Sequence, residues 1–378
     1  MKIVYLIGEA LDTHPGLADK IGGQTAHWRA AGHEVQLLEH RDRAPADAAD
    51  SLAGRAALRV RDGAGRAALF ARLSLQYRFA REQLARHEPD LVYTRYLFPA
   101  PGVGALLRGP FPVVVEVNSD DRSEYLQRGR ITGLYNSLAR RAALRGAAGA
   151  VFVTRELAAS PSFSCIEGPR LVLANGIDLS QVTFAERTTN EVPQLAFVGS
   201  PGQAWHGLDK LGTMAANLPG AVFHVIGPSR EECERVLGGI PGNVRCHGYL
   251  PGAEVDALLA GVDFGIGSLA LHRNAMDEAC PLKVRRYLAH GLPVISGCRD
   301  TDIDGDRPFF LELENSEDNV RRGRARIEAF VAAGFRDEAL RRVARTFAER
   351  ELTEEEKERR RLEFLEQIAA RSARAGDQ

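Results

Sequence analysis

Cysteine is scarce in this sequence and forms no recognisable metal-binding or disulfide pattern. The five cysteines are Cys165, Cys233, Cys246, Cys280 and Cys298, and no two of them are spaced as C-x-x-C. An odd number without such a pair argues against both a disulfide framework and a zinc site. A reducing cytoplasm is therefore the expected location.

Long apolar runs and an excess of one charge are also missing. The run Ile3–Ile7 near the start is much shorter than the core of a signal peptide, and no other run approaches the roughly 18 residues of a membrane span. The formal net charge is −1, so no bulk field favours nucleic acid. With 378 residues, 44% hydrophobic and 26% charged, the chain is expected to form two or three globular domains.

A dinucleotide-binding G-x-G-x-x-G motif is absent, although the chain begins as an α/β protein. A strand is expected at 2–7, a loop with Gly22-Gly23, a helix to Ala31 and a second strand at 34–38. A glycine pair in such a loop suits close approach to a ligand or a simple turn. The other expected strands are 91–94, 113–117, 150–154, 171–173, 195–198, 222–226, 244–247, 263–266 and 293–296. Two doubly wound domains, residues 1–185 and 186–350, follow from this alternation, with a polar linker at 186–191 and a cleft between the domains.

The stretch from Met276 to Ile295 carries the strongest chemical signal. Pro281 suits the start of a helix and Gly291 suits its end. The backbone N–H groups of Leu282, Lys283 and Val284 would then point toward an anion at the helix start, where Lys283 adds a positive charge. Glu278 is expected in the loop just before. The alternative is an ordinary amphipathic core helix.

This stretch resembles the signature of retaining glycosyltransferases of family 4, which have two facing Rossmann-like domains (the GT-B fold). The resemblance implies that Glu278 faces the donor sugar and that a second glutamate, with seven residues between, holds the ribose. Arg286 occupies that second position, and arginine has no acceptor for ribose hydroxyls. Either the nucleotide is held differently or donor binding has been lost.

Three further segments support the same resemblance. Gly22-Gly23 matches a glycine pair near the donor or acceptor, and Asn175-Gly176 matches a turn at the domain crossing. The loop after the 195–198 strand suits a diphosphate, but Ser200 and His206 stand where the family usually has arginine and lysine. The candidate catalytic residues are Glu278 and Lys283. The candidate donor contacts are Gly23, Gly199, Ser200, His206, Tyr249, Leu282, Val284 and Arg286.

Acceptor contacts are expected at the ends of two strands of the first domain, where α/β proteins bind ligands. The candidates are Arg95, Glu116 and Asn118, each with a surface or capping role as the alternative. The resemblance implies transfer without a metal or other cofactor, and a last helix at 351–378 that packs back on the first domain. The arginine-rich segment 122–145 either lies on an anionic membrane or is a solvated helix over a packed face.

The expected function is transfer of a sugar from a nucleoside diphosphate (NDP) sugar to a hydroxyl group, with retention of anomeric configuration. The acceptor would be a glycan, a lipid-linked molecule or a small molecule, and the enzyme would be cytoplasmic or peripheral to the inner face of a membrane. Two alternatives remain: a catalytically silent glycosyltransferase-like partner, favoured by Arg286 and the missing loop cations, and a nucleotide-sugar epimerase of the same architecture.

Overall fold

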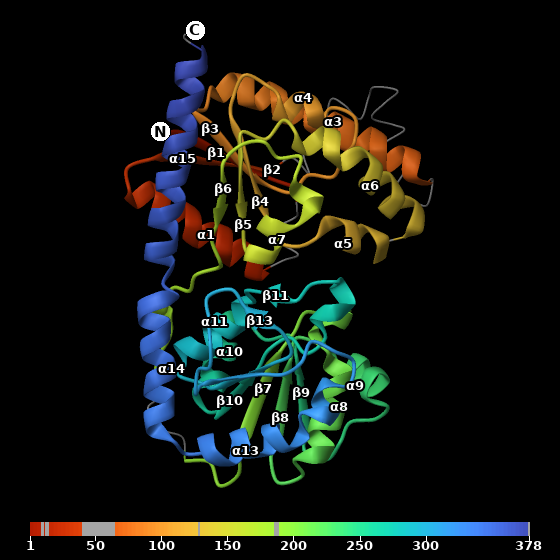
Figure 1. The fold of residues 1–378 in the computed structure, drawn as a ribbon, viewed down its shortest axis with the longest axis vertical. Helices are drawn as coiled ribbons and strands as arrows, with labels where there is room; N and C mark the ends of the chain where they lie inside the picture. The colour runs from red at the N-terminus through yellow and green to blue at the C-terminus, as the bar shows by residue number, and fades with distance from the viewer. Residues whose placement is uncertain (9–10, 12–14, 40–64, 128, 185–188, 377–378) are drawn as a thin grey trace. The chain divides into compact units, whose positions relative to one another are not determined.

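The chain forms two compact units. The computed structural model describes residues 1–8, 11, 15–39, 65–127, 129–184 and 189–376 (Figure 1). Unit 1 comprises Met1–Leu173 and Glu358–Gln378, and unit 2 comprises Ala174–Lys357. The first division thus falls before the expected boundary at residue 185, and the expected linker 186–191 begins outside the described residues. Among the described residues, no helix combines the length and the apolar character needed to cross a membrane.

Unit 1 is built on a parallel six-stranded sheet in the order β2-β1-β3-β4-β5-β6. Its strands are β1 Lys2–Ile7, β2 Glu34–Glu39, β3 Leu91–Arg95, β4 Val113–Val117, β5 Gly149–Phe152 and β6 Arg170–Val172. Its helices are α1 Pro15–Ala30, α3 Gly65–His87, α4 Val103–Leu107, α5 Asp121–Gln127, α6 Arg130–Leu144, α7 Arg155–Ala159, the short η4 Pro161–Phe163, and most of α15 Glu354–Gly376. The inner strands β1, β3, β4 and β5 are almost completely buried, as parallel sheets with helices on both faces require, whereas the edge strands β2 and β6 are partly exposed.

Helix α1 begins before the glycine pair, so the expected glycine loop at Gly22-Gly23 is wrong. Both glycines lie inside α1, and Gly23 is therefore a helical residue. Two glycines weaken a helix by roughly 1 kcal/mol each relative to alanine. Burial of Ile21 and Trp28 against the sheet outweighs this cost, because tertiary packing rather than propensity supplies most helix stability.

The C-terminal segment is two helices, α14 Glu338–Glu351 and α15, and α15 lies within the range 351–378 expected for the last helix. Buried Leu352 and the bridge of Thr353 to Ile177 mark the interruption. Further along, α15 places apolar side chains in the same core as α1 and β1. These are Leu362, Phe364, Leu365 and Ile368.

Unit 2 contains a second parallel six-stranded sheet, in the order β14-β12-β10-β7-β8-β9. Its strands are β7 Gln194–Val198, β8 Val222–Ile226, β9 Val244–Gly248, β10 Phe264–Ile266, β12 Val294–Ser296 and β14 Phe310–Glu312, with a separate pair β11 Glu278–Ala279 and β13 Arg299–Asp300. Its helices are η5 Leu179–Gln181, η6 Ala204–His206, α8 Leu208–Asn217, α9 Arg230–Leu237, α10 Gly252–Ala260, η7 Leu271–Asn274, α11 Leu282–Ala289, α12 Asn319–Arg322, α13 Arg324–Gly334 and α14. Strands β11, β13 and β14 were not anticipated; each has only two or three residues, and all but Glu278 and Asp300 are half-buried or exposed.

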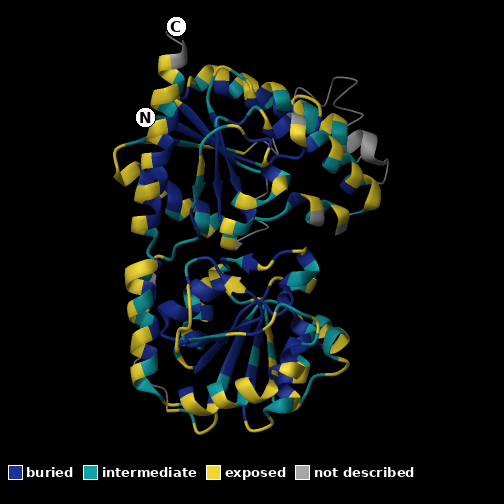
Figure 2. Ribbon diagram, viewed as in Figure 1, coloured by how far each residue is buried: buried dark blue, intermediate teal, exposed yellow. Residues whose placement is uncertain are grey.

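Two cores cover the two faces of the second sheet (Figure 2). One core joins the strands to α8, α9 and α13, and the other joins them to α10, α11 and α14. The chain order along the sheet reverses between β7 and β10, which are neighbours in space but not in sequence. In such sheets the crevice at the carboxyl ends of the two reversing strands is the usual ligand site.

Candidate functional site

The loops that follow β7 and β10 are bonded to each other at this reversal point. The Leu269 N–H donates to the His206 carbonyl (3.1 Å), and the Ala270 N–H donates to the Trp205 carbonyl (3.2 Å). The two loops thus form one backbone unit at the carboxyl ends of the strands. This unit fixes His206, which sequence analysis placed only by its position in a glycine-rich loop.

His206 and Lys283 meet inside this unit. Lys283 Nζ lies 3.1 Å from His206 Nδ1 and 4.6 Å from the centroid of the Phe197 ring. Both side chains are 8% exposed. Burial lowers the pKa of Lys283 to about 7, and burial together with the lysine charge lowers the pKa of His206 to about 2. His206 is therefore neutral, and Lys283 exchanges its proton near neutral pH, so that an added anion would stabilise its charged form.

Close approach of the first loop to His206 requires glycine at position 199. A Cβ atom on Gly199 would lie 2.8 Å from the Phe197 ring and 3.2 Å from His206 Nδ1. The Gly199 N–H donates to the Ile226 carbonyl (2.9 Å), so this backbone is part of the sheet edge. Gly199 thus makes room for the imidazole beside the strand end.

Helix α11 begins at Leu282 with Pro281 as its N-cap, as the sequence predicted, and Gly291 follows its end. The Val284 N–H donates to the Pro281 carbonyl (3.0 Å), so its expected availability to a phosphate is wrong. The groups left at the helix start are those of Leu282 and Lys283. The Val198 N–H donates to the Tyr287 hydroxyl (2.7 Å) and ties α11 to the end of β7.

Glu278 lies in the short strand β11, opposite Arg299 of β13, and not in an open loop. Its side chain is buried, with 6% exposure. The neighbouring backbone is held by Asn175, whose amide donates to the Cys280 carbonyl (2.9 Å). Asn175 therefore supports the segment between Glu278 and α11, although residues 175–176 do not form the expected turn.

Arg286 forms a bidentate ion pair with Asp256 of α10. The Nε–Oδ1 and Nη2–Oδ2 distances are 2.7 and 2.6 Å, and Nη2 also donates to the Gly252 carbonyl (2.6 Å). His290 Nε2 lies 2.9 Å from the same carboxylate. Burial raises the pKa of Asp256, but the bonds from His290 and Arg286 outweigh burial and lower it to about 2. The guanidinium of Arg286, which stands where the family has its second glutamate, is thus engaged by Asp256.

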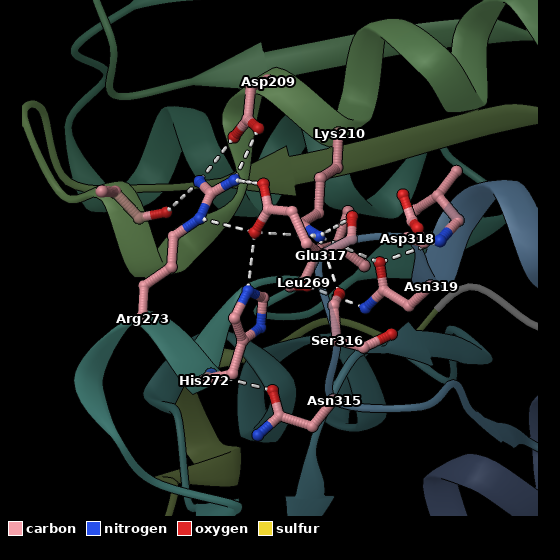
Figure 3. Close-up of polar contacts among 12 residues, drawn as sticks. Asp209, Lys210, Leu269, His272, Arg273, Asn315, Ser316, Glu317, Asp318 and Asn319 are labelled. Carbon is pink, nitrogen blue, oxygen red and sulfur yellow. Dashed lines mark hydrogen bonds and ion pairs between the residues drawn. The ribbon is translucent and has the colours of Figure 1, made fainter.

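A polar cluster connects the loops that follow β7 and β10 to segment 315–319 (Figure 3). Arg273 binds Asp209 through two bonds of 2.8 Å and donates to the Ala204 carbonyl (3.0 Å). Buried Lys210 donates to the Ser316 carbonyl (2.8 Å). Sequence analysis missed this cluster, because its members come from three distant segments, 204–210, 269–273 and 315–319, with no common spacing.

The same cluster reaches the segment that leads into Glu278. Asn315 donates to the Met276 carbonyl (2.8 Å) and to Asp277 Oδ1 (2.7 Å), and Asn319 donates to the Leu269 carbonyl (2.9 Å). The loop with His206 and the segment with Glu278 therefore share one support. Such support preorganises a site, since it removes the freedom of the groups that touch a ligand.

Three of the remaining candidate donor contacts are exposed at the surface. Ser200 is exposed beside Gly199, Leu282 is 38% exposed, and Tyr249 is 67% exposed immediately after β9. Val284, in contrast, is buried in the core under α11. Its side chain packs against the sheet and leaves it no direct role at the surface.

Unit 1 places Glu116 at the centre of a buried ion cluster. Lys20 Nζ lies 2.6 Å from Oε1, Arg361 Nη1 lies 2.9 Å from Oε2, and the Tyr93 hydroxyl donates to Oε2. Arg361 also pairs with Glu358 (2.9 Å). Glu116 is 0% exposed, so these contacts assign it a structural role, and we do not carry it forward as an acceptor contact.

Asn118 and Arg95 lie beside this cluster. Asn118 Oδ1 accepts a bond from Lys20 (3.2 Å), and Arg95, the last residue of β3, is opposite Glu116 in the sheet register. Both stay predictions as acceptor contacts. Lys20 was missed, because its partners lie 96 and 98 residues away in the sequence.

No group of three or more His, Cys, Asp or Glu side chains in the described ranges is arranged to hold a metal ion. The site thus combines the buried lysine Lys283, the start of α11 and the buried carboxylate of Glu278. The arrangement can therefore bind an anion through a buried lysine and a helix start, with a carboxylate nearby.

Comparison with known proteins agrees with this architecture. Residues 16–174 match the family described as glycosyl transferase 4-like domain, which is less than half of the chain. The sequence matches no curated protein. The fold is similar to sucrose-phosphate synthase from Thermosynechococcus elongatus, at 14% identity and a TM-score of 0.73, covering 98% of this chain and 100% of that one.

Two structures with bound nucleotide sugars are also similar. Anabaena HepE in complex with UDP-glucose has 15% identity and a TM-score of 0.60, covering 100% of this chain and 99% of that one. The structure described as "Trehalose-6-phosphate from E. coli bound with UDP-2-fluoro glucose" has 12% identity and a TM-score of 0.64, covering 98% and 99%. The predicted α/β fold with two Rossmann-like domains of the GT-B type is confirmed.

Proposed function

We propose that this protein is a glycosyltransferase that moves a sugar from an NDP-sugar to an acceptor hydroxyl, with retention of anomeric configuration. The observation that carries the proposal is the buried Lys283–His206 pair at the start of α11, at the reversal point of the second sheet. A buried cation beside a neutral imidazole is poised to receive an anionic group. The family match over residues 16–174 and the nucleotide-sugar complexes of similar fold support the choice of ligand.

In this proposal the diphosphate binds to Lys283 and to the N–H groups of Leu282 and Lys283. Charge develops on the diphosphate as the bond to the sugar breaks, so a preorganised cation stabilises the transition state more than the ground state. Gly199 and Ser200 line the same strand end. Tyr249, exposed after β9, is the proposed contact for the base.

Glu278 is proposed to position the donor sugar and to stabilise its developing positive charge. Its place in β11, supported by the cluster around Arg273 and Asn315, fits a group that must stay fixed during reaction. Arg286 is proposed to act indirectly, because its guanidinium is bound to Asp256. The acceptor is a glycan, a lipid-linked molecule or a small molecule, with Arg95 and Asn118 as the proposed contacts, and no metal is required.

A thermal-shift screen across nucleoside diphosphates and NDP-sugars tests the proposal, because a ligand that binds the native state raises the unfolding temperature. We expect stabilisation by at least one diphosphate, and turnover lowered roughly 100-fold by Glu278→Gln. Absence of stabilisation by every diphosphate would favour the silent partner protein. Wild-type turnover in Glu278→Gln would remove Glu278 from the site.

A further inference from the structure

One helix of unit 1 has two well-defined faces, and only one of them is covered. The inner face of α6 is buried at Gly133, Asn136, Arg140 and Leu144. The outer face carries large apolar side chains that are exposed: Ile131 by 57%, Leu134 by 61% and Leu138 by 75%. Residues spaced by three and four positions share one face of a helix, so these three side chains form a continuous stripe.

The inner face of α6 is firmly anchored. Arg140 Nε and Nη2 bind Asp121 at 2.7 and 2.6 Å, and Asn136 donates to the same carboxylate (2.6 Å). The Tyr135 hydroxyl donates to the Pro99 carbonyl (2.7 Å). The stripe therefore cannot become buried by rotation of the helix without breaking this buried ion pair.

Helix α5 adds one more exposed apolar side chain next to α6. Leu126 is 51% exposed, but it packs against Gly133 on the inner face of α6, where an added Cβ atom would lie 2.7 Å from the Leu126 Cα atom. Four of the ten large apolar side chains exposed in the described part of the chain thus lie on this one pair of helices: Leu126, Ile131, Leu134 and Leu138. Scattered exposed apolar residues are ordinary, whereas such a group marks an interaction surface.

The charges around the stripe have one sign. Arg130 precedes it, and Arg141 and Arg145 continue it at the same three- and four-residue spacing, all exposed. Helix α6 contains no acidic residue. On α5, Asp121 is buried against Arg140, and Glu124 accepts a bond from Ser119 (2.6 Å). A second copy of this surface would bring arginines against arginines, so the charge complementarity favours an anionic partner.

We propose that the surface formed by Ile131, Leu134, Leu138, Arg130, Arg141 and Arg145 binds the headgroup layer of an anionic lipid bilayer. The leucines and isoleucine would enter the boundary between headgroups and acyl chains, and the arginines would bind lipid phosphates. The exposure of Ile131, Leu134 and Leu138 favours the membrane interpretation of segment 122–145, because these three apolar side chains are not packed against unit 1. The proposal does not depend on the proposed enzymatic function.

Co-sedimentation with vesicles of phosphatidylcholine alone, and of phosphatidylcholine mixed with phosphatidylglycerol, tests this surface. We expect binding to the mixed vesicles that weakens in high salt, since exposed charges are screened. Leu134→Gln with Leu138→Gln should weaken binding at least about tenfold, and Arg141→Gln with Arg145→Gln about 10- to 30-fold. The matched controls are Val343→Gln, 47% exposed on α14, and Arg321→Gln with Arg324→Gln, exposed in unit 2.

A probe of depth completes the test. The tryptophan fluorescence added by Leu138→Trp should be quenched by brominated lipids, whereas the fluorescence added by Val343→Trp should not. Vesicle binding that is unchanged in the double leucine variant overturns the proposal, as does unquenched Leu138→Trp. A dimer in solution that the leucine changes abolish, without vesicle binding, would identify the surface as a contact between copies and would also overturn it.

Discussion

Each unit buries a lysine near the carboxyl ends of its sheet, and the two lysines have opposite surroundings. In unit 1, Lys20 contacts the Glu116 carboxylate at 2.6 Å. In unit 2, Lys283 contacts a neutral imidazole and an aromatic ring and forms no ion pair with any described residue. A buried cation with a carboxylate is already satisfied, whereas a buried cation without one is stabilised by an anion from outside. We therefore assign a structural role to Lys20 and a ligand-binding role to Lys283.

Breaking the satisfied cluster should have the largest effect on stability. Arg361→Ala removes one cation and leaves Glu116 and Glu358 buried, so we expect the free energy of unfolding to fall by about 3–5 kcal/mol. Chemical denaturation measures the change. Arg359→Ala is the matched control, because the Arg359–Glu363 pair lies on the same helix but is exposed and should contribute less than about 1 kcal/mol. Equal effects would refute a central role for the cluster.

The two lysines should respond to the same substitution with opposite signs. Lys20→Met leaves Glu116 with one cation fewer and should lower the free energy of unfolding by about 3 kcal/mol. Lys283→Met removes a charge that burial disfavours and should raise it by about 1–3 kcal/mol when no ligand is bound. Chemical denaturation of both variants at neutral pH measures these changes. A loss of stability in Lys283→Met would contradict the assignment of Lys283 to ligand binding.

Ligand binding should depend on Lys283 in a way that separates phosphate from nucleoside. Lys283→Ala should weaken nucleoside diphosphate binding by about ten- to a hundred-fold, because a charge-assisted contact contributes roughly 1.5–3 kcal/mol. Nucleoside binding serves as the internal control and should change little. Calorimetric titrations measure both affinities, and equal weakening would place Lys283 outside the phosphate site.

The pH dependence of Lys283 sharpens the same contrast. Its pKa of about 7 in the free protein lies below the value near 10.4 of an unfolded lysine, so the unfolded state binds more protons between these values. Stability should therefore rise with pH from about 7 to 10 in the wild type relative to Lys283→Met. A bound diphosphate raises the lysine pKa, so binding at pH 8 should take up a proton. Calorimetry in buffers of different ionisation enthalpy detects this uptake. Proton uptake that persists in Lys283→Met would show that the proton does not bind to Lys283.

Arg286 provides the smallest expected effect. Arg286→Glu places two carboxylates together at Asp256 and should lower the free energy of unfolding by about 1–2 kcal/mol. The exchanged pair Arg286→Glu with Asp256→Arg should recover most of this loss if the contact is structural. The affinity for the NDP-sugar should fall in Arg286→Glu and recover in the exchanged pair, in parallel with the free energy of unfolding. Higher donor affinity in Arg286→Glu would instead mean that a carboxylate is missing from a ribose site.

The sequence predicted the elements that periodicity and caps specify. Pro281 and Gly291 gave the limits of α11, and the apolar runs gave the long strands of both sheets. It did not predict that α1 continues through Gly22-Gly23, because burial of Trp28 overrides the weakness of glycine. Glu116 was predicted as an acceptor contact, and the sequence did not reveal its buried partners Lys20 and Arg361, which lie 96 and 245 residues away. Partners that are so far apart in the sequence leave no local sequence pattern from which the contact could be predicted.

The composition of unit 1 has a consequence for biosynthesis. Its core and its ion cluster need Leu362, Leu365, Ile368 and Arg361 from α15, whereas unit 2 ends at Lys357. During translation, unit 2 has its complete sequence before unit 1 does, so the region synthesised first reaches its native state last. Until α15 emerges from the ribosome, the apolar face of β1 stays exposed, and a nascent chain arrested before residue 358 should be a chaperone substrate and protease-sensitive within residues 1–173.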